Sequence, residues 1–274
     1  MNTPTFIFFG TSEFSVYVLR SLEEYNLLPQ AVVTFPDKPE GRHLILTPNP
    51  VKQWAQDHHI KIIESLKFKT PEFEEVLKIE NADVFVVASF GKILPDNIIY
   101  MPPFKTLNVH PSLLPKLRGP SPIQGAIIHE NETGVSIMRL SDKMDGGPIL
   151  LQKKVEFSSW PIPYSEAEEM LGKIGGEILA EVLHKLGTTQ YPEIEQDHSQ
   201  ATYTHMIQKS EGDISSDSPD MALRKINAFE KWPRTRLGDL IITNAHIENG
   251  ELIIKKVIPP GKKEMLYNDY LRNK

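Results

Sequence analysis

The first hundred residues alternate between short apolar segments and segments with helical spacing, and this alternation constrains the fold more than any other feature of the sequence. The apolar segments predict strands at residues 6–9, 31–35, 61–63 and 84–88. The segments between them predict helices at residues 14–22, 51–57 and 73–79. Because strand, helix and strand repeat in this order, we expect right-handed crossover connections. The sequence therefore predicts an α/β fold with a mostly parallel sheet that helices cover on both faces.

The pattern changes after residue 100, where strands and helices no longer alternate regularly. Further strands are predicted at residues 106–109, 135–140, 149–155, 240–243 and 251–258. Further helices are predicted at residues 123–129, 164–186 and 219–229. Asn249-Gly250 predicts a hairpin between the last two strands. Residues 189–205 are polar and poorly periodic, so we expect a linker there, between a domain at 1–188 and a smaller β-rich domain at 206–274.

Length and composition exclude several classes of protein. The chain of 274 residues has the length of one large domain plus a small one. It contains no cysteine, which excludes disulfides, thiolate zinc sites and a cysteine nucleophile. Its start does not have the composition of a secretory signal, and it has no run of about 18 apolar residues. We therefore expect a cytoplasmic protein that does not span a membrane.

The distribution of charge bears on the kind of partner. The net charge of −6 argues against a protein that coats nucleic acid non-specifically. From Met221 to the end, however, 11 Lys and Arg residues stand against 6 Asp and Glu residues. A basic tail on an acidic body fits an anionic partner that contacts one end of the protein, although the same asymmetry also arises by chance.

The first predicted strand-to-helix turn, FFGTSEF, bears on cofactors. It holds one glycine, Gly10, whereas a dinucleotide-binding turn needs three at fixed spacing so that the pyrophosphate can approach the helix. We therefore do not expect the protein to bind nicotinamide or flavin nucleotides.

Polar side chains that could carry chemistry lie at the end of the predicted strand at 106–109. Ligands of open α/β sheets bind beyond the carboxyl ends of the strands, and residues two apart on a strand share a face. Asn108 and His110 can therefore converge on one atom, and the Gly-rich loop with Asp142 and Asp145 can reach the same edge. An amide to stabilise an oxyanion, an imidazole to move a proton and a carboxylate to orient it suit acyl transfer. No residue lies in a nucleophile elbow, which favours direct transfer.

A structural interpretation of the same residues stays open at this point. An isolated Asn-x-His is most often structural, and Asp142 and Asp145 are also common turn residues because Asp hydrogen-bonds its own backbone. The remaining histidines, including His58 and His59, are interpreted as surface residues. No group of residues has metal-ligand spacing, so no metal is expected.

The segment LNVHPSLLPKLRGPSPIQGAIIHENETGVSIMRLSDKMDGGPIL, residues 107–150, resembles the signature region of the folate-dependent formyltransferases. Within them it most resembles the methionyl-tRNA formyltransferases. The matching elements are Asn-x-His-x-Ser-Leu-Leu-Pro at 108–115, Arg-Gly at 118–119, Pro-Ile-Gln at 122–124, Glu-Thr-Gly-Val at 132–135, and Asp145. The resemblance extends to FFGTSEFSVYVL, PDKPEGR, PNPVK, VVASFGKILP, YTHMIQKSEGDI and INAFEKWPRTR. It covers about the first 235 residues, with a weaker similarity in PPGKKEM.

The resemblance implies a Rossmann-like formyltransferase domain and a reaction. In that reaction, 10-formyltetrahydrofolate gives its formyl group to the α-amine of initiator methionyl-tRNA, and the enzyme is expected to be a monomer. The implied catalytic residues are Asn108, His110 and Asp145. The pterin pocket is implied to involve Ser112, Leu113, Leu114 and Pro115 together with Phe90, Gly91 and Leu94. Phe14 and Arg42 are implied to face the methionyl-adenosine end of the tRNA, although Phe14 is equally well explained as a core residue.

Two departures from the family pattern keep a second acceptor open. Leu44 and Ile45 stand in the loop GRHLIL, where the tRNA enzymes usually carry basic residues. About 40 residues follow Arg236, whereas the family's oligonucleotide-binding barrel has roughly a hundred, so we expect a truncated, reduced version of it. Fewer phosphate contacts would weaken tRNA binding. The alternative is a sugar-nucleotide N-formyltransferase that uses the same folate donor. A purine-pathway formyltransferase is shorter, and a silent binding protein has no chemical reason to keep all three catalytic residues.

Overall fold

A computed structural model describes residues 3–40, 44–186 and 192–272. The chain divides into two compact units, and each of them is assembled from separate stretches of the chain. Unit 1 comprises Met1–Gly119, Gly134–Val155 and Glu169–Tyr203, and unit 2 comprises Pro120–Thr133, Glu156–Glu168 and Thr204–Lys274. The domain limits expected from the sequence, 1–188 and 206–274, stay a prediction.

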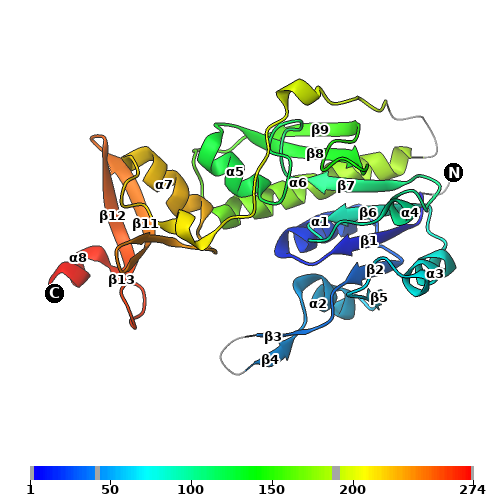
Figure 1. The fold of residues 1–274 in the computed structure, drawn as a ribbon, viewed down its shortest axis with the longest axis horizontal. Helices are drawn as coiled ribbons and strands as arrows, with labels where there is room; N and C mark the ends of the chain where they lie inside the picture. The colour runs from blue at the N-terminus through cyan, green and yellow to red at the C-terminus, as the bar shows by residue number, and fades with distance from the viewer. Residues whose placement is uncertain (1–2, 41–43, 187–191, 273–274) are drawn as a thin grey trace. The chain divides into compact units, whose positions relative to one another are not determined.

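Unit 1 is built on a seven-stranded sheet with the order β5-β2-β1-β6-β7-β8-β9 (Figure 1). The strands from β5 to β7 pair in parallel, and β8 runs antiparallel to β7. This confirms the mostly parallel sheet that the sequence predicts. The strand bounds are β1 Phe6–Gly10, β2 Ala31–Thr34, β5 Lys61–Glu64, β6 Val84–Ala88, β7 Thr106–His110, β8 Thr133–Arg139 and β9 Ile149–Val155.

The central strands of unit 1 are apolar because both of their faces are covered. All five residues of β1, and likewise of β6, are buried. On one face Ile7 and Phe9 pack with residues of α3 and α4, and the Phe9 ring meets that of Phe90 edge-on at 5.5 Å between centroids. Continuous apolar strands of this kind are typical of parallel sheets between helices.

The helices of unit 1 begin at residues that satisfy their free amide groups. Ser12, Asn49 and Thr70 cap α1, α2 and α3 by accepting from backbone N–H groups of the first turn. Proline occupies the first turn of α2 and α3, where no N–H partner is required. The bounds are α1 Glu13–Glu24, α2 Pro50–Asp57, α3 Pro71–Glu80, α4 Asp96–Ile99 and α6 Tyr164–Lys185, whose first turn falls in unit 2.

A short hairpin that the sequence does not predict lies between β2 and α2. It pairs β3 Lys38–Glu40 with β4 Ile45–Thr47 in an antiparallel two-stranded sheet. Leu44 and Ile45 are exposed there, at 71% and 65%. Arg42, which the resemblance implies to be a substrate contact, lies outside the described residues.

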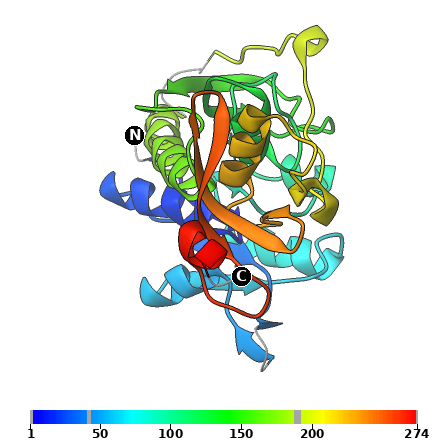
Figure 2. The ribbon, with the colours of Figure 1, turned by 90° about the vertical axis from the view of Figure 1, so that its left-hand side faces the viewer.

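Unit 2 contains an antiparallel sheet with the order β10-β11-β12-β13 beside α7 (Figure 2). This confirms a separate β-rich region near the C-terminus. Asn249 and Gly250 both have positive φ in the β11–β12 turn, which confirms the predicted hairpin. The bounds are α5 Pro122–His129, α7 Pro219–Ala228, β10 Thr235–Leu237, β11 Leu240–Glu248, β12 Glu251–Ile258, β13 Met265–Leu266 and α8 Tyr267–Arg272.

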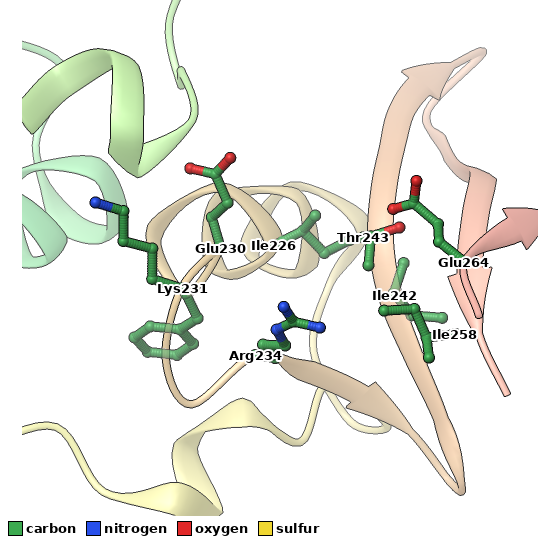
Figure 3. A pocket seen from close by; sticks show the side chains of 9 residues that line it. Ile226, Glu230, Lys231, Arg234, Ile242, Thr243, Ile258 and Glu264 are labelled. Carbon is green, nitrogen blue, oxygen red and sulfur yellow. The ribbon is translucent and has the colours of Figure 1, made fainter. Parts of the chain in front are cut away.

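Unit 2 has its own apolar core and a small cavity. Ile226 of α7 packs with Ile242 of β11 and Val257 of β12. Beside this core, a cavity of about 340 Å³ is lined by apolar side chains and by charged ones that include Arg234 and Glu264 (Figure 3). All of its lining belongs to unit 2, whereas the sheet edge with Asn108 and His110 belongs to unit 1.

No helix within the described residues combines the length and the apolar character that crossing a membrane requires.

Candidate active site

Strand β7 brings Asn108 and His110 to the carboxyl end of the parallel part of the sheet (Figure 1). Asn108 lies opposite Val87 of β6 on one side and Met138 of β8 on the other. Asn108 is 8% exposed and His110 is 4% exposed. Two polar side chains are thus buried at the edge where α/β proteins bind their ligands.

The hydrogen bond that His110 makes to the backbone sets its tautomer. Nε2 lies 2.9 Å from the carbonyl oxygen of Leu117, and a carbonyl can only accept, so Nε2 must carry a hydrogen. The other ring nitrogen, Nδ1, lies 3.7 Å from Oδ1 of Asp145. Nδ1 is therefore the nitrogen that can gain or lose a proton, and a protonated ring would direct this hydrogen toward the carboxylate.

Asn108 approaches the same carboxylate oxygen. Its Nδ2 lies 3.5 Å from Oδ1 of Asp145, which is at the long limit for a hydrogen bond. The amide, the imidazole and the carboxylate therefore converge, as expected from the positions of their strand and loop. Catalytic contacts are often this loose before substrate binds and tighten in the reacting complex.

The loop after β8 places Asp145, and not Asp142, beside Asn108 and His110. Asp142 is exposed. Asp145 has a φ of +46°, and its Oδ2 accepts a 2.7 Å hydrogen bond from the amide of Gly119. Two residues later, a Cβ on Gly147 would come within 2.1 Å of the carbonyl oxygen of Arg139, so this tight passage of the chain requires glycine.

A buried polar network that the sequence did not predict holds the loop that carries Asp145. Arg118 is 2% exposed, and its Nε and Nη2 donate to Oε1 of Gln196 at 3.2 and 2.6 Å. Gln196 in turn donates from Nε2 to the carbonyls of Asp145 and Gly147 at 2.9 and 2.7 Å. Arg118 was part of the family motif, but Gln196 lies in the segment interpreted as a linker, where no periodicity marks it.

Side chains from β8 and β9 fix the Ser112–Pro115 loop. The buried Ser112 hydroxyl donates to the carbonyl of Lys116 at 2.7 Å. Ser136 donates to the carbonyl of Ser112 and accepts from the amide of Leu114, at 2.7 and 3.2 Å, while Gln152 donates to the carbonyl of Leu114. The Ser112 hydroxyl thus has a role within the loop. A part for Ser112, Leu113, Leu114 and Pro115 in binding folate stays a prediction.

The segment after β6 has buried and open positions. Phe90 and Leu94 are 2% and 4% exposed within the apolar core of unit 1. Gly91 has a φ of +75°, and a Cβ built there meets nothing within 4 Å. Ile93 is 79% exposed. If this segment lines a pterin pocket, its exposed backbone and Ile93 are better placed to do so than the side chains of Phe90 and Leu94.

Phe14, in the first turn of α1, is 3% exposed. The core interpretation that the sequence left open accounts for this burial, and its contact with a substrate stays a prediction. Across the part of the chain that the structure describes, no group of three His, Asp or Glu residues is arranged to hold a metal ion.

Comparisons with known proteins show the family of the chain. The family model described as Formyl transferase matches residues 5–178. The methionyl-tRNA formyltransferase of Methylococcus capsulatus is 35% identical over an alignment 295 residues long. The alignment covers 97% of this chain and 95% of that protein.

Solved structures show the same fold at low identity. The methionyl-tRNA formyltransferase from Clostridium thermocellum has a TM-score of 0.62 at 18% identity, covering 93% of this chain and 99% of that one. The N-formyltransferase from Helicobacter canadensis, solved with folinic acid and dTDP-3-aminofucose, has a TM-score of 0.61 at 17% identity, covering 90% and 88%. With a family model over more than half of its length and a relative aligned along nearly all of it, this chain belongs to the formyl transferase family.

Proposed function

We propose that the protein transfers the formyl group of 10-formyltetrahydrofolate to the α-amine of methionine carried by initiator tRNA. The observation that carries the chemistry is the convergence of Asn108, His110 and Asp145 on one point at the carboxyl end of β7. The choice of acceptor is supported by the 35% identity with a methionyl-tRNA formyltransferase along nearly the whole chain. The protein is proposed to act as a monomer in the cytoplasm.

In the first step the amine nitrogen attacks the formyl carbon. A C–N bond forms, and the carbonyl π electrons move to oxygen. An aminoacyl ester amine is less basic than a lysine amine, so part of it is already unprotonated at pH 7. This neutral amine can attack the formyl carbon without a strong base. Asn108 Nδ2–H donates to the oxyanion, and the positive charge of protonated His110 beside it stabilises the developing negative charge. Donors that are already in position stabilise this charge without reorganising.

In the second step the bond between the formyl carbon and the folate nitrogen breaks. The electron pair stays on the folate nitrogen, which takes up the proton that the attacking amine loses. Asp145 accepts this proton from the amine, directly or through water, and passes it on. The products are the N-formyl amine and tetrahydrofolate. Asp145 also stabilises the charge of protonated His110, because its Oδ1 faces Nδ1.

The runner-up acceptor is an amino sugar on a nucleotide. The observation that favours it is the apolar surface of the β3–β4 hairpin, where Leu44 and Ile45 are exposed. Apolar side chains give no neutralisation of phosphate, which supplies much of the affinity for nucleic acid.

A direct assay separates the two acceptors. Purified protein is incubated with 10-formyltetrahydrofolate and either methionine-charged initiator tRNA or a dTDP-amino sugar, and formylated product is measured by mass spectrometry. We expect formylmethionine on the tRNA. Formylation of the amino sugar without formylation of the tRNA would establish the runner-up.

Donor binding is tested without turnover. Folinic acid should raise the melting temperature, because a ligand that binds only the native state stabilises it by about 2.7 kcal/mol at a concentration of a hundred times its Kd. NADH should leave the melting temperature unchanged, since the turn at Gly10 lacks the glycines of a dinucleotide site. A shift with NADH and none with folinic acid would refute the folate assignment.

A further inference from the structure

We propose that Gln196 is a positioning residue for Asp145, and that the segment Ile194–Tyr203 is thereby part of the active site. This proposal rests on the proposed function, because it assigns a role that is expressed through Asp145. We call residues Ile194–Tyr203 the strap. All of the interactions that carry the proposal lie within unit 1.

The strap is anchored to β9, just after the loop that carries Asp145, and to the loop whose Leu117 carbonyl binds His110. At one end, Ile194 exchanges two 2.9 Å backbone hydrogen bonds with Ile149, just after the Asp145 loop. At the other end, the carbonyl of Thr202 accepts from the amide of Arg118, and its hydroxyl accepts from the amide of Leu117, both at 2.9 Å. Leu117 is the residue whose carbonyl binds His110. The strap therefore connects the loop behind His110 with the loop that carries Asp145.

Gln196 joins these two loops through its side-chain amide. Arg118 can only donate, so it fixes the Gln196 oxygen on its own side and turns the NH₂ group toward the carbonyls of Asp145 and Gly147. Gln196 is 6% exposed, so water does not readily replace these hydrogen bonds. A buried carbonyl that loses its partner is costly, and the loop would shift to find another.

Asp145 depends on this support because its backbone has an uncommon conformation. A φ of +46° is uncommon for a residue other than glycine, and Asp is one of the few residue types that adopt it more often. Gln196 binds its carbonyl and the amide of Gly119 binds its Oδ2, which leaves Oδ1 facing Asn108 and His110. When the hydrogen bonds of Gln196 are removed, this oxygen moves, and a displacement of about 1 Å in such a site can cost about a hundredfold in rate.

The test is a double-mutant cycle on the full chain. Gln196→Met keeps the length of the side chain and removes its hydrogen bonds. We expect kcat to fall about 10- to 100-fold, with KM for donor and acceptor changed less than about twofold, because Asp145 acts on the reacting atoms. In an Asp145→Asn background, Gln196→Met should lower kcat by less than about a further twofold. Gln196 acts through the carboxylate of Asp145, which this background lacks, so the two effects on kcat are not additive.

Two further variants act as controls. Gln196→Glu retains the acceptor for Arg118 but loses the donors, so it should be as slow as Gln196→Met. Gln200→Met changes an exposed glutamine of the same strap, which donates to Asp197, and should leave kcat and KM unchanged. Wild-type kcat in Gln196→Met, or an equal loss in both backgrounds, would overturn the positioning role.

Hydrogen exchange gives a readout that does not depend on catalysis. In Gln196→Met, the peptide covering residues 140–150 and the amide of Gly119 should exchange at least about tenfold faster, and in Gln200→Met they should not. Unchanged exchange would refute the proposal. If the wild type formylates neither acceptor, the proposed function fails, and the exchange experiment still decides whether Gln196 holds the Asp145 loop.

Discussion

At the scale of single residues, the site directs two nitrogen atoms at one carboxylate oxygen. Oδ2 of Asp145 is occupied by the amide of Gly119, so Oδ1 is the oxygen that faces Asn108 and His110. The carbonyl of Leu117 holds Nε2 of His110, so only Nδ1 is directed at Asp145. Each group thus presents a single atom to the reacting centre. This explains why the site needs the surrounding loops as well as the three side chains.

The corresponding prediction concerns the three side chains. Asn108→Ala should lower kcat about 100- to 1000-fold by removing an oxyanion donor. His110→Ala and Asp145→Asn should also abolish most of the turnover, because the first removes the positive charge beside the oxyanion and the second removes the group that accepts the amine proton. Steady-state kinetics at saturating donor and acceptor measures the loss, with the melting temperature as a check on folding. Asp142→Asn, in the same loop but exposed, is the matched control and should have wild-type kcat. A variant of the three that retains near-wild-type turnover removes that residue from the mechanism.

At the scale of elements, β7 depends on the close approach of α6. A Cβ on Gly175 would lie 2.8 Å from Cγ1 of Val109, and one on Gly172 would lie 2.5 Å from Cβ of Tyr17 in α1. Glycine at 175 lets the long helix pack directly on the strand that carries Asn108 and His110, and glycine at 172 lets it pack closely on α1. The packing of an element remote from the chemistry therefore helps to fix the position of the site.

This packing can be tested by adding and then removing one clash. Gly175→Ala should destabilise the protein by about 1–3 kcal/mol, because overpacking displaces β7, and it should lower kcat as well. Gly175→Ala combined with Val109→Ala removes the atom in the way and should recover part of both losses. Thermal unfolding and kcat are the measurements. If the stability that the double variant loses equals the sum of the losses in Gly175→Ala alone and Val109→Ala alone, Val109 is not the side chain that limits the approach of α6.

The elements also show how far the sequence could predict the fold and the site. The strands β1 and β6 were predictable because each is an apolar run, and Asn108 and His110 followed from the end of the strand predicted at 106–109. The hairpin of β3 and β4 was not predictable, since KPE and ILT are three-residue strands without periodicity and one contains proline. The strap was interpreted as a linker because its buried residue, Gln196, is polar and its anchors are backbone groups far along the chain.

At the scale of the whole molecule, the two units differ in what they offer a substrate. Unit 1 holds the three polar side chains of the site, and unit 2 holds the basic tail that begins at Met221. Some of this basic charge is used within unit 2, because Arg224 donates to the carbonyls of Ile127 and Glu130 near the end of α5. Lys255, Lys262 and Lys263 are exposed, and Lys256 is exposed beside Glu264. These lysines are the candidates for contact with a polyanion.

The last prediction therefore concerns these four lysines and the acceptor. Deleting residues 237–274 would remove Ile242 and Val257 from the core of unit 2, so it would test folding rather than binding. Replacing the four lysines with glutamine keeps the core. If initiator tRNA is the acceptor, KM for the charged tRNA should rise, while transfer to a methionyl-adenosine acceptor stays unchanged, because the small acceptor lacks the distant phosphates.

The log–log dependence of tRNA binding on salt should become shallower by about 0.9 for each duplex phosphate that the variant no longer neutralises. The melting temperature should change little, since surface ion pairs such as Lys256–Glu264 contribute at most about 1 kcal/mol. An unchanged KM and salt slope would show that these lysines do not bind tRNA. If the variant loses transfer to both acceptors equally, the substitutions alter catalysis at the active site and not the binding of tRNA.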